Sequence, residues 1–231
     1  MLFRSAFAVA GLNVLGWLAF VTFGPVVSHS TDVFFALTTF YGIMASLLVG
    51  SLASAEERQL GTHEWQVLTP IASSTQWAVK AGVVLGLALL LAFGLPVLLT
   101  SINPGLEGFR WPLLVVAVVV LTSGGLYVSS VSASGLWAML ASLSAVFGVV
   151  WFGLFLKFRL SEMLGRGFNL DLPPDSALDL MLAVAFVVLL LWLALVNHRS
   201  AERAGRRIWA QGLWLVLCLT AQIIVTGLVA R

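Results

Sequence analysis

Long apolar blocks separated by short polar segments account for most of this chain. Most blocks reach the ~20 residues that an α-helix needs to cross the hydrocarbon core of a bilayer. They cover residues 5–27, 33–60, 74–100, 112–129, 137–156, 176–197 and 208–230. The pattern therefore predicts an all-α protein, a polytopic transmembrane helical bundle of six helices with a seventh at the C-terminal end.

The first block, residues 5–27, has one alternative interpretation, a secretory signal peptide. Its length of about 23 residues exceeds the usual apolar core of a signal peptide. The segment Gly24-Pro25-Val26-Val27 also makes a poor cleavage site. We therefore expect a transmembrane helix here.

Small residues and prolines within the blocks predict how the helices pack. Gly82 and Gly86 have the spacing that lets two helices approach closely in lipid, although glycine is also common in membrane helices without that role. Pro96 is expected to kink the outer end of the same helix. The uncharged, small residues of 129–137 predict a tight, buried hairpin between the fourth and fifth helices.

The longest loop is expected on the outer face, over residues 157–176, where Lys157 and Arg159 follow the fifth block. A short interfacial helix is expected before Gly165, built on the apolar residues Phe158, Leu160, Met163 and Leu164.

The longest polar interruption in the first half of the chain lies between the second and third blocks. Gly61 occupies the place of a left-handed helix cap, and Thr62 can cap a short helix that Pro70 ends. Trp65 and Leu68, three residues apart, share one face of that helix. This local order indicates a contact segment rather than a simple spacer.

The third helix has its own start signal. Ser73 and Gln76 fit the S-x-x-Q capping box, which pairs both side chains with main-chain donors of the first turn. We therefore expect Ser73 to cap this helix.

Basic residues decide the orientation, because cytoplasmic loops of membrane proteins carry an excess of Lys and Arg. With the N-terminus in the cytoplasm, the inner segments hold Arg4, Arg58, Lys80, Arg199, Arg203, Arg206 and Arg207. The outer segments then hold Arg110, Lys157, Arg159, Arg166 and Arg231. The four clustered arginines before the seventh block give this choice most of its weight, so we expect a multi-pass protein of the inner (plasma) membrane with a cytoplasmic N-terminus.

Composition excludes several classes of protein. Apolar residues make up 60% of the chain, charged residues 10%, and the mean hydropathy of +1.04 lies outside the range of soluble domains. A net charge of only +2 gives no reason to expect nucleic-acid binding. A single cysteine, Cys218, allows neither an intrachain disulfide nor a thiolate metal site.

Motifs of catalysis are missing from the sequence. Neither lysine belongs to a phosphate-binding loop, and the three histidines are spread over separate loops, so we expect no enzyme, no cofactor and no metal site. Ionisable groups at membrane depth, which proton-coupled carriers usually need, are also absent from the middle of the blocks. A transport path would be lined by apolar, aromatic, Ser, Thr and Gly side chains, which suits a lipid-like or amphipathic cargo.

The polar connection resembles that of permease subunits of type 2 ABC transporters. Many of these carry, after their second transmembrane helix, an acidic pair, Gly-Thr, a Glu, an apolar group, a Pro and then a Lys on the next helix. Here the pattern stands as Glu56 and Glu57, Gly61 and Thr62, Glu64, Val67 and Leu68, Pro70, and Lys80. Outside residues 56–80 the similarity is one of layout only.

The resemblance implies a coupling helix on the cytoplasmic side that docks into a groove of a separate ATPase subunit. The ATPase contacts would be Glu56, Glu57, Arg58, Gly61, Thr62, His63, Glu64, Trp65, Leu68 and Pro70. Lys80 would be an interfacial anchor. The function implied is ATP-driven transport across the membrane, with membrane lipid around the chain and either a homodimer or pairing with a second permease module.

One feature departs from the family, whose usual module has six helices with both ends inside. Residues 1–200 would form that module, and residues 201–231 add a basic cytoplasmic loop and a seventh helix. Either the last helix is an addition or the chain is the first part of a longer permease. One alternative function is a membrane scaffold or assembly protein without transport. Another is a membrane-embedded enzyme, although the sequence shows no catalytic cluster that would support it.

Overall fold

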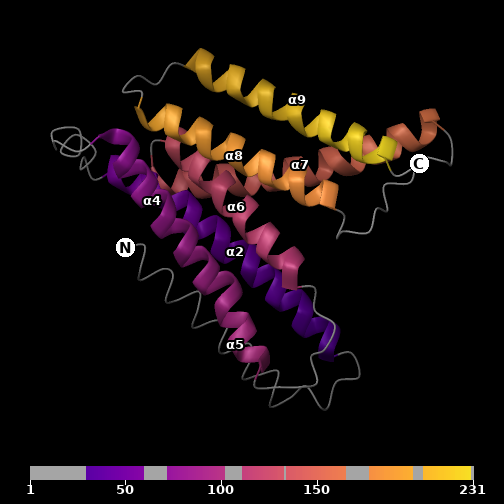
Figure 1. The fold of residues 1–231 in the computed structure, drawn as a ribbon, viewed down its shortest axis with the longest axis horizontal. Helices are drawn as coiled ribbons and strands as arrows, with labels where there is room; N and C mark the ends of the chain where they lie inside the picture. Colours follow the sequence, from indigo (N-terminus) through magenta and orange to yellow (C-terminus); the bar gives the residue numbers. More distant parts are fainter. Residues whose placement is uncertain are drawn as a thin grey trace.

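A computed structural model of the chain describes residues 30–59, 72–101, 111–132, 134–164, 177–199 and 205–229. Nearly all of these residues are helical, as predicted, and they form six continuous helices. The elements are α2 (Ser30–Gln59), α4 (Ser73–Ala88), η2 (Leu89–Gly94), α5 (Leu95–Ser101), α6 (Trp111–Val131), α7 (Gly135–Leu164), α8 (Ala177–Arg199) and α9 (Gly205–Val229). The segments α4, η2 and α5 follow one another without a break and make a single rod (Figure 1).

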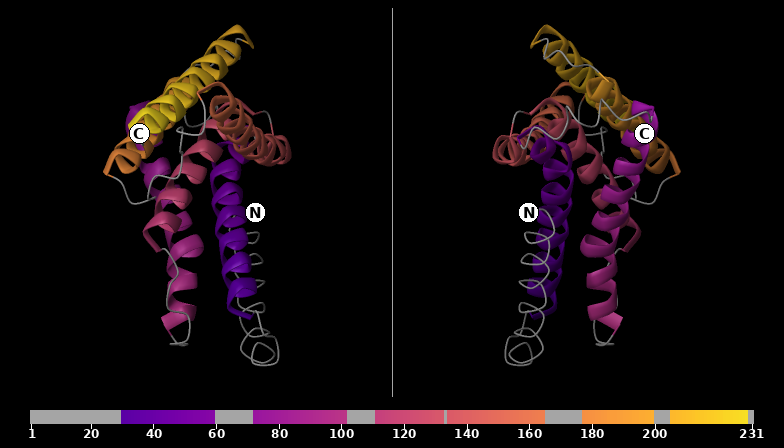
Figure 2. Two further views of the ribbon diagram at one scale, coloured as in Figure 1. Left: turned by 90° about the vertical axis from the view of Figure 1, so that its right-hand side faces the viewer. Right: turned by 90° about the vertical axis from the view of Figure 1, so that its left-hand side faces the viewer.

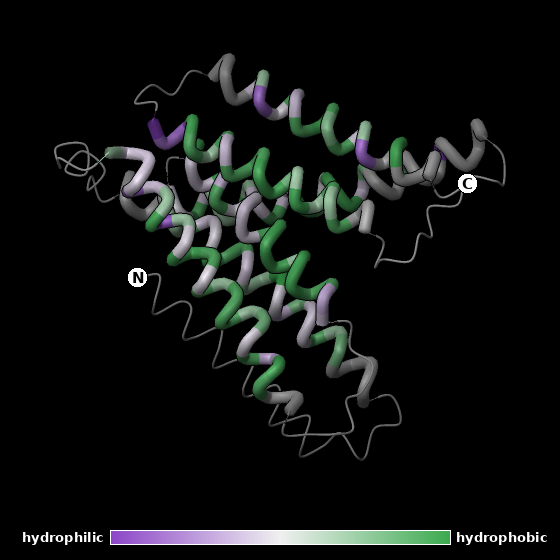
Figure 3. Tube along the Cα trace, viewed as in Figure 1, coloured by the Kyte–Doolittle hydropathy of each residue, from purple (hydrophilic) through white to green (hydrophobic). Residues whose placement is uncertain are grey.

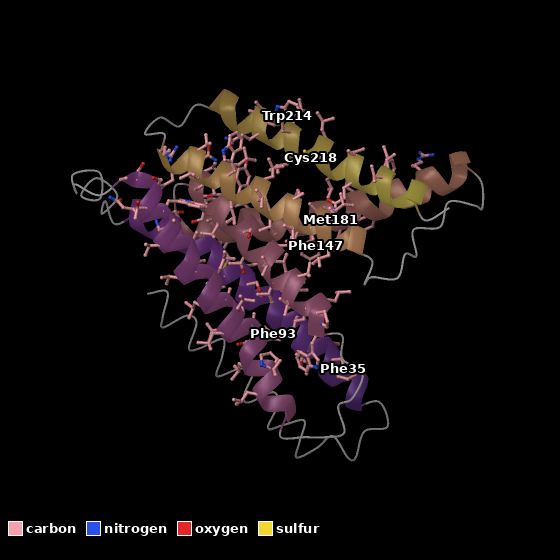
Figure 4. The ribbon with its side chains drawn as sticks, in the orientation of Figure 1. Phe35, Phe93, Phe147, Met181, Trp214 and Cys218 are labelled. Atoms are coloured by element: carbon pink, nitrogen blue, oxygen red, sulfur yellow. The ribbon has the colours of Figure 1, made fainter. Side chains whose placement is uncertain are left out.

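Five of these helices are long and apolar enough to cross a membrane. The spans are Phe35–Ala53, Ser73–Leu98, Trp111–Val131, Gly135–Phe152 and Leu180–Arg199. Large apolar side chains are exposed on α7, α8 and α9, among them Phe147, Met181 and Trp214 (Figure 4). Trp151, Trp192 and Leu213 are exposed as well. Many residues along these three helices are hydrophobic (Figure 3). Because such exposure is costly in water and favourable in lipid, the chain has the character of a multi-pass membrane protein.

The helices form two groups. α2, the α4–α5 rod and α6 stand side by side, and α7, α8 and α9 lie obliquely across one end of them (Figure 2). Gly42 of α2 lies against Leu114 of α6, and Gly50 lies against Thr122, so α2 and α6 run in parallel. We call the end where Gln59 and Ser73 lie the proximal end of the bundle, and the opposite end the distal end.

The core has two parts that meet at the proximal end. The larger joins α2, the rod and α6 through buried residues that include Tyr41, Val49, Ala88, Val118 and Leu126. The smaller joins α6 to α8 through Tyr127, Leu190, Leu193 and Ala194. Trp77, in the second turn of α4, packs against both parts and so ties the start of the rod to α6 and α8.

The closest helix contact is between α2 and α6. A Cβ atom at Gly50 would lie 2.5 Å from the carbonyl oxygen of Thr122, and one at Gly125 would lie 3.0 Å from the carbonyl carbon of Gly50. A Cβ at Gly82 or Gly86 would meet nothing within 4 Å in the described part of the chain. Of the two interpretations of Gly82 and Gly86, the structure favours the one without a packing role among the helices described, because both glycines are exposed.

Two local expectations need correction. Ser73 is the first residue of α4 rather than its cap, since the capping position is Ala72, which has no side-chain hydrogen bond to the helix end. The expected loop from Lys157 is also wrong at its start, because α7 continues to Leu164 without a separate interfacial helix. The Arg159 guanidinium lies 5.6 Å from the Phe155 ring centroid, a contact four residues apart that favours continued helix.

The tight hairpin between the fourth and fifth predicted helices is confirmed. α6 ends at Val131 and α7 begins at Gly135. Ser129 and Ser130 are buried, as predicted, whereas Leu136 and Trp137 at the other end of the expected segment are exposed by 70% and 66%. The hairpin is therefore only partly buried.

Candidate functional site

The predicted ATPase contacts divide between two parts of the chain. Glu56, Glu57 and Arg58 belong to the last turns of α2. The others lie outside the described residues, namely Gly61, Thr62, His63, Glu64, Trp65, Leu68 and Pro70. Lys80 lies in the second turn of α4 and is half-buried. The structure thus fixes the two helices that flank the segment and brings their ends to the proximal end of the bundle.

A buried cluster of polar side chains lies at the same end, where α6, α8 and α9 meet. Asn197 Nδ2 donates to Gln211 Oε1 at 3.0 Å, and Gln211 Nε2 donates to Asn197 Oδ1, also at 3.0 Å. Asn197 is in the last turn of α8 and Gln211 is in the second turn of α9, so the two amides join consecutive helices across their connection. We call these two residues, with Tyr127 and Ser130, the amide cluster.

α6 contributes two hydroxyl groups to the amide cluster. The Tyr127 hydroxyl donates to Gln211 Oε1 at 3.3 Å, and Asn197 Nδ2 donates to Ser130 Oγ at 3.3 Å. Ser130 Oγ itself donates to the Tyr127 carbonyl at 2.6 Å, which leaves its lone pairs free to accept from the amide. Tyr127 and Ser130 are three residues apart and therefore share one face of α6.

Because the amide cluster is buried, its polar groups need hydrogen-bond partners within the protein. All four side chains of the amide cluster are buried, with Asn197 exposed by 5% and Gln211 by 7%. An amide left unpaired among apolar helices would be costly, whereas each interhelical hydrogen bond stabilises a membrane protein by about 0.6 kcal/mol on average. The cluster therefore fixes the position of α9 relative to α6 and α8.

The chemistry of the amide cluster is structural rather than catalytic. Amides and hydroxyls that already bond to one another offer neither a general base nor a nucleophile with an activating partner. In the described part of the chain no group of three His, Cys, Asp or Glu side chains lies close enough to bind a metal ion.

The sequence does not predict the amide cluster. It predicts Asn197 only as the end of the sixth helix, and Gln211 only as part of the last apolar block. The last apolar block holds two glutamines, Gln211 and Gln222, and a glutamine buried in a membrane needs a hydrogen-bond partner, but the sequence does not tell which of the two is buried. The partners themselves come from α6 and α8, far away in sequence, so the pairing required the fold.

Comparisons with known proteins add no relative. No protein-family model matches the chain, and no curated protein matches it.

Proposed function

We propose that this chain is the membrane-spanning subunit of an ATP-driven transporter similar to the type 2 ABC class. The observation that carries the proposal is the connection between α2 and α4. The membrane-length helix α2 ends at the proximal end of the bundle, and the rod begins there with α4. The polar segment between them in the sequence holds Glu64, Trp65 and Pro70 in the order typical of a coupling helix.

The packing around this connection supports transmission of a movement into the membrane. α2 lies backbone to backbone on α6 at Gly50 and Gly125, so a displacement of α2 carries α6 with it. The start of α4 is tied to α6 and α8 through Trp77. A push on the segment between α2 and α4 therefore reaches the core of the bundle through both of its flanking helices.

In the proposed mechanism, a separate ATPase dimer closes on ATP and pushes on residues 56–80. Glu56, Glu57, Arg58 and Glu64 make polar contacts to it, Trp65 and Leu68 fill its groove, and Lys80 stays at the membrane interface. A second copy of the chain or a second permease module completes the transport path. A lipid-like or amphipathic cargo fits a path without ionisable groups at membrane depth.

Purification from native membranes is the first test. The tagged full chain is extracted in mild detergent and its bound proteins are identified. An ATPase with a phosphate-binding loop is the expected partner. Its consistent absence would contradict the proposal and favour a scaffold or assembly role with another soluble partner.

Substitution in the coupling segment tests the mechanism itself. Glu64→Gln combined with Trp65→Ala should reduce stimulation of the partner's ATPase activity about tenfold, as expected when a charged and an aromatic anchor are lost from one interface. Membrane insertion should be unchanged. The matched control, Glu107→Gln with Trp151→Ala, removes the same chemistry from a loop expected on the outer face and from an exposed site in the middle of α7, away from the proximal end. Equal ATPase stimulation in the two double variants would contradict the coupling role.

A further inference from the structure

The rod made by α4, η2 and α5 contains one wide helical turn. Over Leu89–Gly94 the backbone is a π-helix, and the N–H of Leu95 donates to the carbonyl of Leu90, five residues back. α-Helix stands on both sides of this turn, so it interrupts a membrane-length helix. Such turns hold one extra residue and recur at functional sites.

Pro96 explains why the wide turn stands where it does. A proline has no N–H, and its ring crowds the carbonyl four residues before it, here that of Ala92. In the wide register the next donor after Leu95 would be residue 96, and its acceptor would be the carbonyl of Leu91. Because Pro96 cannot donate, the Leu91 carbonyl needs a donor from elsewhere.

Tyr41 of α2 supplies that donor. Its hydroxyl donates to the Leu91 carbonyl at 3.0 Å, and its side chain is only 7% exposed. The next residue, Gly42, also lies against the turn, since a Cβ there would be 3.5 Å from the Ala92 carbonyl oxygen. The wide turn is thus held by a side chain of a different helix.

The turn is also anchored on α6. Phe93, within η2 and labelled in Figure 4, lies edge-on to Trp111, with ring centroids 6.0 Å apart and an interplanar angle of 78°. The preceding helix α4 is held separately, through its buried residues Ala81, Val84 and Ala88. The rod therefore has a fixed proximal part and a distal part whose register depends on the contacts at η2.

We propose that η2 is a hinge with two registers and that the Tyr41 hydroxyl is its latch. With the hydroxyl on the Leu91 carbonyl, the wide turn is held. Without it, the extra residue leaves the turn, the helix closes to ordinary α geometry, and α5 rotates about its own axis by about 100°, the angle that one residue covers.

The rotation would redirect the exposed side chain of Leu98 while α4 stays packed at the proximal end. The link between this rotation and ATP hydrolysis rests on the function proposed above. The hinge itself does not depend on that function, because both registers are conformations of this chain without any partner.

A distance measurement between α2 and α5 tests the hinge. Spin labels replace Leu37 and Leu98, which are 52% and 60% exposed, in the full chain with Cys218→Ala and in lipid nanodiscs without any ATPase. The parent should give one distance distribution. Tyr41→Phe keeps the ring and removes the hydroxyl, so a second distance should appear, with the ratio of the two registers changed roughly five- to tenfold, as for the loss of one hydrogen bond.

Two further variants make the result decisive. Tyr127→Phe removes another buried tyrosine hydroxyl, one that bonds to Gln211 instead of η2, and should leave the parent distribution unchanged. Pro96→Ala removes the ring that crowds the α register, so it should also produce the second distance. The proposal is overturned if inserted Tyr41→Phe protein gives the parent distribution, or, should that variant fail to insert, if Pro96→Ala gives it. Since no ATPase is present, failure of the transporter proposal would leave these results unaffected.

Discussion

Gly50 and Gly125 determine how closely α2 and α6 pack. At both positions the space that a side chain would need is occupied by main-chain atoms of the other helix, which cannot move as a flexible side chain would. Thr122 and Ser123, at the same height on α6, are fully buried although their hydroxyls make no hydrogen bond in the described part of the chain. Small size therefore matters more than polarity at this contact, as is usual where membrane helices meet.

A single methyl group tests this contact. Gly50→Ala should lower the free energy of unfolding by about 1–3 kcal/mol, because the added Cβ meets a main-chain oxygen and forces the helices apart. The measurement is reversible unfolding in mixed micelles. Gly86→Ala is the matched control, since nothing lies within 4 Å of that position, and it should cost no stability. Equal losses for both variants would show that the effect comes from the glycine backbone and not from the contact.

Residue spacing alone could not identify this contact. Gly82 and Gly86 have the four-residue spacing typical of close helix packing, yet they face outward, whereas Gly50 and Gly125 belong to different helices and have no spacing to recognise. The four-residue spacing of two glycines indicates that one face of the helix carries no large side chains. Which face meets a neighbour depends on the register between helices, which a single sequence does not reveal.

At the scale of elements, the apolar blocks predicted the helices well and their ends less well. α2 and α8 begin and end within about three residues of the expected bounds, because membrane-length apolar runs leave few alternatives to helix. α7 exceeds its apolar block by a further two turns, because charged residues such as Arg159 also favour helix once a preceding turn exists to continue. The wide turn in the rod has Pro96 just after it and receives a hydrogen bond from Tyr41 of another helix, and only the proline could be recognised in the sequence.

The amide cluster is the element-scale link between α8 and α9, and a double-mutant cycle measures it. Asn197→Leu and Gln211→Met should each lower the free energy of unfolding by about 1–3 kcal/mol, because each leaves a buried amide without its partner. The double variant should lose less than the sum, with a coupling energy of about 0.6–1.7 kcal/mol.

The control for this cycle is Gln222→Met, a glutamine of the same helix that is half-exposed and lies outside the amide cluster. It should show no coupling to Asn197→Leu. Strictly additive losses for Asn197→Leu and Gln211→Met would show that the two amides do not stabilise each other.

At the scale of the whole molecule, the parallel course of α2 and α6 agrees with the order of membrane crossings that the sequence predicted. Two helices that run in the same direction need one crossing between them, and the rod provides it. The last residues of α2 and α8 and the first residues of α4 and α9 then lie at one end, together with the hairpin between α6 and α7 (Figure 1). This is the end for which the arginine count predicts the cytoplasm.

In the proposed function, a soluble ATPase reaches the segment between α2 and α4 from the cytoplasm. The most direct measurement introduces Glu64→Cys into the full chain with Cys218→Ala and applies a membrane-impermeant thiol reagent to intact cells and to inverted membrane vesicles. We predict labelling in the inverted vesicles only. Labelling in intact cells, with none in the vesicles, would place the segment where no ATPase can bind it and would contradict the account.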